Sequence, residues 1–318
     1  MGYLNISDAD LKKSATTFQK ELLMTPVISC SDTLQHFTGR PGVAGREVIG
    51  QLTGNIELGP YNATRVDDTG VNITPRVLET YLGSVVKRFD PNEAAKTVWG
   101  EAFAQGEELT KAALVLQVLT YLSAQLGKMI GAALWTAERD ASGDKTKNLF
   151  DGFDTITKKE IDASSISTTQ GNLHEFPEAF SDTNTVDLLM KFYEGAAPEL
   201  QAVETKLYIP HSLYNAYNRD YATRFGSTPY NHEYSKTFLE GTQNLCELVP
   251  LASKKGSEYV HLSTKKNMLY GYGAGMADEN IAIEKYHEFL ISFVATMYFG
   301  VQFETIAKES LFAGKIHA

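Results

Sequence analysis

The feature of this sequence that most limits its fold is a long, thin β-hairpin in the first third of the chain. Residues 40–90 are rich in glycine and β-branched residues and have no helical period. The segments EVIGQLTGNIEL and VNITPRVLETYLGSVVKRF predict two strands, with GPYNATRVDDTG as the turn between them. Large apolar side chains are sparse, and glycines and Pro75 interrupt the strands. Such a hairpin predicts docking on another surface, and a mobile ribbon without a partner is the alternative.

Composition limits the class of protein. The chain has 318 residues, 43% of them hydrophobic, which is enough for a sizeable core in one large domain or two smaller ones. A net charge of -10 with scattered lysines and arginines argues against tight nucleic-acid binding. Cys30 and Cys246 fit no metal spacing and predict free thiols in a reducing compartment. The polar start of the sequence predicts no secretory signal.

Residues 93–139 are predicted to be helical. An apolar stripe recurs there at intervals of three and four, formed by Val115, Leu119, Leu122, Leu126, Met129 and Ala133. The apolar run 112–135 has the length of a membrane span, but Gln117, Gln125 and Lys128 lie inside it. A long soluble helix is therefore the prediction.

Helical and irregular segments flank that helix. Residues 1–25 predict an arm with a short amphipathic helix, which either docks on its own domain or reaches a neighbouring subunit. A polar loop and a compact turn are expected over 139–162, where Asp151 and Asp154 either hold a hard cation or form a plain turn. Residues 163–184 are expected to be irregular, and a helix is expected from Thr185 through VDLLMKFYEGAAPEL.

A separate α/β unit is predicted over 203–270. It consists of a strand at TKLYIP, a helix at HSLYNAYNRDYATRFG, and short strands at CELVPLAS and EYVHLST. After it, ENIAIEKYHEFLISFVATMYFGVQFETI predicts strands, because apolar and polar residues alternate most clearly from 297 to 304.

Signatures of catalysis are missing from the sequence. Gly271, Gly273 and Gly275 follow a lysine pair, but no helix follows them to receive a phosphate, and they are interpreted as a turn. The seven histidines show no zinc spacing, and His211–Tyr214 and His232–Glu233 are acid–base pairs in principle only. We therefore predict no catalytic, metal or cofactor-binding residues, and a structural or binding protein.

The order of these elements resembles the major capsid proteins of tailed bacteriophages, whose shell-forming fold is shared with encapsulins. The resemblance covers nearly the whole chain and rests on ordered features. Local phrases that support it are LFDGFDTI, YIPHSLYNAYNRDY, HLSTKKNMLYGYGAG and YFGVQFET. It implies an α+β fold in five parts. These are an N-terminal arm (1–40), an extended β-hairpin loop (41–75), a peripheral domain (76–184) with a spine helix at about 105–139, an axial domain (185–275) and closing strands of the peripheral domain (276–318).

The resemblance implies a structural function. Copies of the chain would assemble into pentamers and hexamers of an icosahedral head that encloses double-stranded DNA, with scaffolding, portal or decoration proteins as further partners. It implies weak, non-specific DNA contact, no membrane, no cofactor, and a location in the virion after assembly in the host cytoplasm. The candidate intersubunit contacts lie in the arm and hairpin: Leu11, Phe18, Leu58, Tyr61, Arg65, Asp67 and Asp68.

Three alternatives stay open from the sequence. An encapsulin shares the fold and would enclose protein cargo in place of DNA. A cytoplasmic enzyme of unrecognised mechanism would need a pocket with perturbed pKa values. A tail-tube or other ring-forming protein would also use hairpins, but the long helix and the inserted α/β unit disfavour it.

The sequence departs from two patterns of the family. Some relatives begin with a helical scaffolding segment that a protease removes, whereas the arm here starts at Met1, which predicts a mature form or a separate scaffold. Others join subunits through lysine–asparagine bonds promoted by a glutamate. The loop 41–75 contains Asn55, Asn62 and Asn72 but no lysine.

We therefore predict that no cross-link of this arrangement forms. Particles boiled in denaturant should give a single monomer band on a gel. A ladder of covalent oligomers would contradict the prediction.

Overall fold

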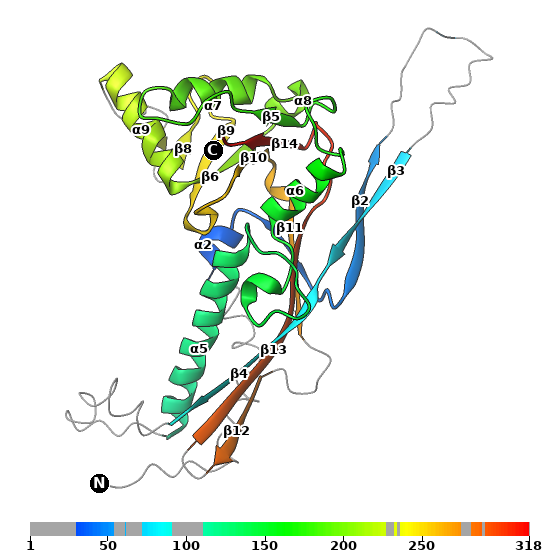
Figure 1. Ribbon diagram of the computed structural model, residues 1–318, viewed down its shortest axis with the longest axis vertical. Coiled ribbons are helices and arrows are strands. Elements are labelled where there is room, and N and C mark those ends of the chain that lie inside the picture. Colours follow the sequence, from blue (N-terminus) through cyan, green and yellow to red (C-terminus); the bar gives the residue numbers. More distant parts are fainter. Residues whose placement is uncertain are drawn as a thin grey trace. The chain divides into compact units, whose positions relative to one another are not determined.

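The computed structural model describes residues 30–53, 61, 72–90, 111–226, 232–233, 236–274, 281–287 and 290–317. The chain divides into two compact units, each made of three segments. The first contains 1–45, 80–152 and 270–300, and the second contains 46–79, 153–269 and 301–318. The fold is mixed α+β, as the sequence predicted (Figure 1).

A five-stranded sheet contains the longest strand. Its strands are β1 (Thr38–Pro41), β4 (Tyr81–Phe89), β11 (Met268–Ala274), β12 (Ile281–His287) and β13 (Leu290–Phe303). The path runs β1-β11-β13-β12, and β4 also pairs with β13. The alternation predicted from 297 to 304 is confirmed, because Met297, Phe299, Val301 and Phe303 are buried and their neighbours Tyr298 and Gln302 are partly exposed.

The long helix α5 (Lys111–Ala133) is confirmed, but its predicted extension to 139 is wrong. Beyond Ala133 the backbone bonds with a distant segment: Glu138 N donates to Lys147 O (2.9 Å), and Gly152 N donates to Ala137 O (2.8 Å). These bonds replace the helical ones, so the helix ends where tertiary partners become available. Residues 93–110 lie outside the described residues.

A seven-stranded sheet forms the core of the second unit. Its order is β5 (Leu173–Glu175), β14 (Leu311–Lys315), β10 (Tyr259–Ser263), β6 (Thr205–Pro210), β9 (Cys246–Leu251), β8 (Lys236–Phe238) and β7 (His232–Glu233). The helices α7 (Thr185–Glu194) and α9 (His211–Phe225) lie beside this sheet (Figure 1). They contribute Phe192 and Tyr217, both fully buried, to its core. The strands at β6, β9 and β10 and the helix at α9 confirm the predictions, whereas β14 was not predicted.

The predicted hairpin is confirmed in part, as a two-stranded ribbon of β2 (Arg46–Thr53) and β3 (Asn72–Glu79) (Figure 1). The predicted second strand, 71–89, was too long, because its later part is the separate strand β4, which pairs with β13. The strands pair antiparallel over eight residues each, from Arg46 opposite Glu79 to Thr53 opposite Asn72. Residues 54–60 and 62–71, which contain most of the predicted turn, lie outside the described residues. A short helix, α2 (Ser31–Leu34), begins soon after the first described residue, and the helix predicted within 1–25 lies outside the described residues.

Three further predictions need correction. The segment expected to be a compact turn contains the helix α6 (Phe153–Asp162), which buries Phe153, Ile156 and Thr157 on one side. The helix that begins at Thr185 ends at Glu194, and α8 (Pro198–Gln201) is separate, because proline favours a new helix start.

Two of the three glycines expected to form a turn, Gly271 and Gly273, lie instead in strand β11, and Gly275 lies outside the described residues. A Cβ atom at Gly273 would lie 2.8 Å from Val43 O, and Gly42 N donates to Tyr272 O at 2.9 Å. Gly273 therefore permits a close backbone approach, which is the other common use of glycine in a strand.

Gly152 gives a direct test of the contact that follows α5. A Cβ atom there would lie 2.3 Å from Trp135 O and 2.5 Å from its carbonyl carbon. Because backbone cannot move aside as a side chain can, Gly152→Ala should lower the free energy of unfolding by about 3 kcal/mol. Gly195→Ala is the control, since its Cβ would meet only ordinary contacts from 3.4 Å. Equal thermal unfolding of the two variants would contradict the packing described.

Candidate functional site

The outer face of the hairpin exposes apolar side chains. Val48 and Val77 lie directly opposite each other on β2 and β3, and they are 74% and 37% exposed. Arg46 and Glu79, one pair further along on the same face, form an ion pair at 2.8 Å. Because this pair is well exposed, it contributes at most about 0.5 kcal/mol. We call the four residues Arg46, Val48, Val77 and Glu79 the outer hairpin face.

The inner face of the hairpin is buried and anchored. Leu78 is fully buried and Ile49 nearly so. Beside them, Arg76 Nη2 donates to Glu160 Oε1 on α6 at 2.7 Å and to Gln302 Oε1 on β13 at 3.0 Å. Gln302 Nε2 in turn donates to Val77 O at 3.2 Å. The inner face of the hairpin is therefore fixed to the rest of the second unit, and its outer face is exposed.

Hydrogen bonds also join the residues that come directly before and directly after the hairpin. Thr80 N donates to Gly45 O at 2.7 Å, and Gly45 N donates to Thr80 Oγ1 at 2.9 Å. The Thr80 hydroxyl lies 3.1 Å from Val43 O. Thr80 is buried, so these bonds are shielded from water.

One face of the strands β4 and β13 is also apolar and open. Leu82 and Val86 on β4 are 50% and 54% exposed, and their partners on β13 are Tyr298 and Val294, which are partly exposed. We call these four residues the open sheet face. It is a second apolar surface that is exposed among the described residues.

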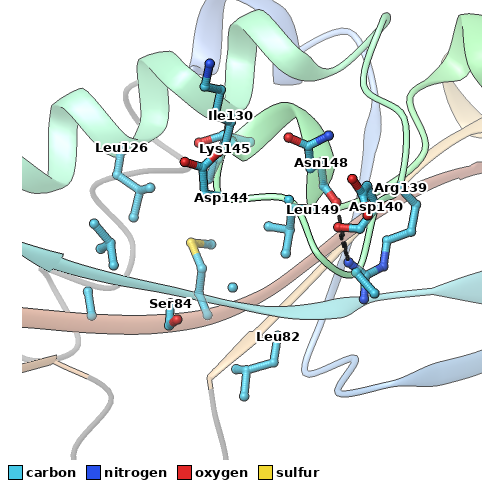
Figure 2. Close-up of a pocket in the computed structure, with 17 residues that line it drawn as sticks. Leu82, Ser84, Leu126, Ile130, Arg139, Asp140, Asp144, Lys145, Asn148 and Leu149 are labelled. Atoms are coloured by element: carbon cyan, nitrogen blue, oxygen red, sulfur yellow. Dashed lines mark hydrogen bonds between the residues drawn. The ribbon is translucent and has the colours of Figure 1, made fainter.

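The opposite side of β4 meets α5 around a pocket of about 450 Å³ (Figure 2). Leu126 and Ile130 of α5 line it with strand residues and the polar loop 139–149. Arg139 Nη1 donates to Asn148 O at 3.4 Å, and the guanidinium lies 4.3 Å from the centre of the Tyr81 ring. Hydrogen bonds from Ser142 lower the pKa of Asp140, which keeps it ionised. The described lining combines apolar side chains of the helix and strands with polar side chains of the loop.

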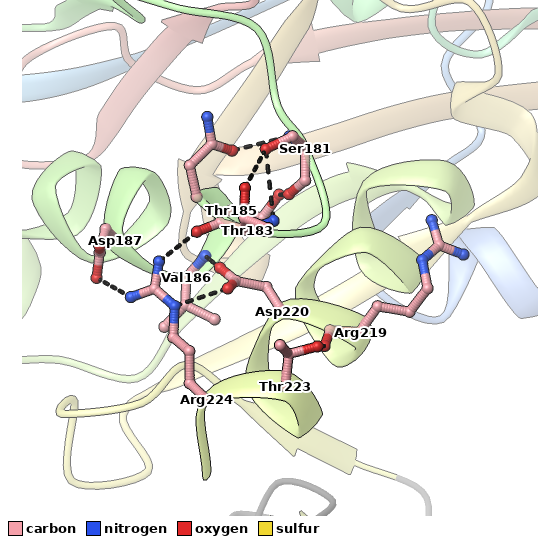
Figure 3. A network of polar contacts seen from close by, with 10 residues as sticks. Ser181, Thr183, Thr185, Val186, Asp187, Arg219, Asp220, Thr223 and Arg224 are labelled. Atoms are coloured by element: carbon pink, nitrogen blue, oxygen red, sulfur yellow. Dashed lines mark hydrogen bonds and ion pairs between the residues drawn. The ribbon is translucent and has the colours of Figure 1, made fainter. Parts of the chain in front are cut away.

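A polar network fixes the start of α7 (Figure 3). Arg224 on α9 donates to Asp187 Oδ1 (2.6 Å), Asp220 Oδ1 (2.7 Å) and Thr183 O (2.6 Å). The buried Asp220 accepts Val186 N at 2.8 Å, which satisfies an amide in the first turn of α7. Arg224 also lowers the pKa of Asp187. The network therefore joins the helices α7 and α9 through side-chain and backbone hydrogen bonds.

The carboxylates considered for a cation have protein partners. Asp151 Oδ1 accepts Arg139 N at 3.0 Å, and Asp154 Oδ1 accepts Lys254 Nζ at 3.1 Å. Over the described ranges, no three side chains of the metal-binding types gather into a site. Tyr214, the proposed partner of His211, lies with its hydroxyl 2.7 Å from Thr237 Oγ1.

The structure describes one of the seven candidate contact residues. Tyr61 is 95% exposed. The other six, Leu11, Phe18, Leu58, Arg65, Asp67 and Asp68, lie outside the described residues. Sequence reasoning selected the hairpin but missed Val48 and Val77. Their strand alternation with the buried Ile49 and Leu78 is the signal that identifies them.

Solved structures with the same fold are phage and phage-like capsids. The satellite phage P4 procapsid matches with a TM-score of 0.56 and 12% identity, over 95% of this chain and 98% of that chain. The cyanophage A-1(L) capsid matches with 0.56 and 11%, over 92% of both chains. The capsid of a native GTA particle matches with 0.54 and 7%, over 91% of both. No protein-family model and no curated protein matches the sequence.

The chain therefore has the fold of these capsid proteins along nearly its full length. The resemblance inferred from the order of elements is confirmed for the fold. Within the described part of the chain, no helix combines the length and apolar character that crossing a membrane requires.

The anchor of the hairpin can be tested by charge removal. Arg76→Met leaves Glu160 partly buried without its cation, and we expect a loss of about 2 kcal/mol in the free energy of unfolding. Hydrogen exchange in β3 should accelerate. Arg46→Met is the matched control, because its ion pair is exposed, and it should change stability by under about 0.5 kcal/mol. Equal effects of the two substitutions in urea unfolding would show that Arg76 is not an anchor.

Proposed function

We propose that this chain is the major capsid protein of a tailed bacteriophage, whose copies form pentamers and hexamers of an icosahedral head around double-stranded DNA. The observation that carries the proposal is the match to capsid proteins over more than nine-tenths of both chains. A hairpin that is anchored on one face and apolar on the other supports it independently. Repeated heterologous contacts of this kind close into rings.

Within this proposal the helix α5 is the spine helix, and the five-stranded sheet belongs to the peripheral domain. The axial domain is then the part built on the seven-stranded sheet, with β5 and β14 added to the residues 185–275. The hairpin β2–β3 is the extended loop. The arm, residues 1–40, and the tip around Tyr61 are the remaining candidate contacts.

The outer hairpin face is proposed to dock on a second copy of the chain. An exposed pair of valines on a rigid ribbon offers apolar area that becomes favourable once water is excluded. Many contacts of modest size then sum to a stable particle. Scaffolding, portal and decoration proteins are further proposed partners. The net charge of -10 fits weak contact with packaged DNA, in the virion and during assembly in the host cytoplasm.

Replacing the valine pair tests this docking. Val48→Asp with Val77→Lys removes the apolar pair and places opposite charges across the strands, which keeps the hairpin paired. The concentration needed for assembly should rise at least tenfold in light scattering, while subunit stability changes by under about 0.5 kcal/mol. The control is Val203→Asp, an exposed valine outside the hairpin. Assembly of the double variant at the wild-type concentration would refute docking through this face.

Deleting residues 58–69 tests the hairpin tip separately. The subunit should fold, because the anchoring contacts of Arg76 lie outside the deleted residues, and assembly should be abolished. A variant that no longer yields soluble subunits would place the tip in the core of its own subunit. The contents of wild-type particles distinguish a phage head from the encapsulin alternative. An encapsulin copurifies with a protein cargo, whereas a phage head contains DNA or is empty.

A further inference from the structure

A buried polar cluster connects α6 to β10 in the second unit. Lys254, at the end of the short helix η2 (Ala252–Lys254), and His261 on β10 are fully buried, and Asp154 on α6 is 6% exposed. Lys254 Nζ lies 3.1 Å from Asp154 Oδ1, 2.9 Å from Ser257 Oγ and 3.2 Å from His261 Nδ1. An ammonium has three hydrogens, and each has one of these acceptors.

Hydrogen bonding at both ends of the imidazole specifies one tautomer. Thr157 Oγ1 donates to Phe153 O at 2.8 Å, so this hydroxyl accepts a hydrogen from His261 Nε2, also at 2.8 Å. The other ring nitrogen, Nδ1, then carries the lone pair that accepts from Lys254. The neutral Nε2–H form of His261 satisfies both contacts, and the doubly protonated form does not.

A second proton on His261 would sit on Nδ1, 3.8 Å from Asp154 Oδ1, a carboxylate oxygen that already accepts from Lys254 Nζ. It would face the Lys254 ammonium, 3.2 Å away, in a fully buried site. Burial, and then the Lys254 charge, hold the pKa of His261 well below 6.5. The other titratable groups around the ring are Asp154 on α6, Tyr259 two residues before it, and Tyr208, which lies opposite His261 on β6.

The ring also belongs to the packing of α6. His261 lies 5.8 Å from the Phe303 ring, which is 5.1 Å from the Phe153 ring. Phe153 is the first residue of α6 and the point at which the chain re-enters the second unit. Movement of His261 away from Lys254 therefore disturbs the apolar contacts that hold the first turn of α6.

We propose that this cluster is an acid-sensitive latch, in which proton uptake by His261 separates it from Lys254 and releases α6 from β10. The latch lies within one subunit and does not depend on assembly. It makes this one helix more responsive to mild acid than the rest of the seven-stranded unit.

The direction in which pH changes the stability of the folded state follows from the lowered pKa of His261. A group that binds its proton less well in the folded state contributes stability above its unfolded pKa, and that stability is lost as pH falls below about 6.5. Burial raises the pKa of Asp154, which acts in the opposite direction. Burial also lowers the pKa of Lys254, to about 8, so its own titration falls in alkaline solution. Asp154 and Lys254 are present in the wild type and in a variant of His261 alike, so the difference in stability between the two proteins from pH 7.5 to 5.5 reports on the histidine.

The substitution His261→Gln isolates the contribution of the histidine's titration. The glutamine amide can accept from Lys254 and donate to Thr157, but it does not titrate. Between pH 7.5 and 5.5, the unfolding equilibrium constant of the wild type should rise about tenfold relative to this variant. His174 on β5, whose pKa burial also lowers, is present in both proteins and cancels. The control is His211→Gln, at an exposed position on α9, which should keep the wild-type pH dependence.

Hydrogen exchange locates the effect. After correction for the intrinsic rate, protection of 153–162 in the wild type should fall about tenfold from pH 7.5 to 5.5, while α9 changes less. The full-length chain is used in one oligomeric state at both pH values, verified by light scattering. His261→Asn serves as a second variant if glutamine impairs folding. Unchanged protection of α6 in the wild type, or equal pH dependence in wild type and His261→Gln, would overturn the proposal.

Discussion

A sheet of two strands has two faces, and this hairpin buries only one of them. Leu78 and Ile49 are covered on the inner face, while Val48 and Val77 remain in water on the outer face. Isolated two-stranded ribbons are marginal, so the ribbon depends on its anchored side for its shape. The exposed face is available to contact another surface. The proposed assembly depends on this difference between a buried inner face and an exposed outer face.

The hydrogen bonds that fix the ribbon to its own subunit affect how well it can dock on a neighbouring one. Arg76, Glu160 and Gln302 hold its inner face, and the bonds between Thr80 and Gly45 hold its root. A ribbon already fixed in direction loses less entropy on docking than a free loop does. The same contacts that stabilise the subunit therefore prepare the surface with which it is proposed to meet its neighbours.

Elements whose side chains repeat with a clear period could be predicted from the sequence. The alternation in β13 and the core of the long helix are examples, and the order of elements was enough to indicate the capsid fold. The helix α6 was missed because lysines and carboxylates dominate its sequence, and its buried side is short. The end of α5 was missed because it depends on backbone bonds to residues 147–152.

The hairpin surface could be predicted from the sequence only in part, because its anchor also depends on residues far away in the sequence. The turn chemistry of the hairpin is local and visible in the sequence. Its anchor joins Arg76 to Glu160, 84 positions away, and to Gln302, 226 positions away. The latch residue His261 likewise faces Thr157 across 104 positions. No spacing rule links such partners, because only the folded backbone brings them together.

Negative-stain electron microscopy of the purified protein tests the central claim most directly. If the chain is a shell subunit, the images should contain closed shells or flat five- and six-membered rings. Uniform particles of monomer or dimer size at every concentration examined would contradict a shell-forming role.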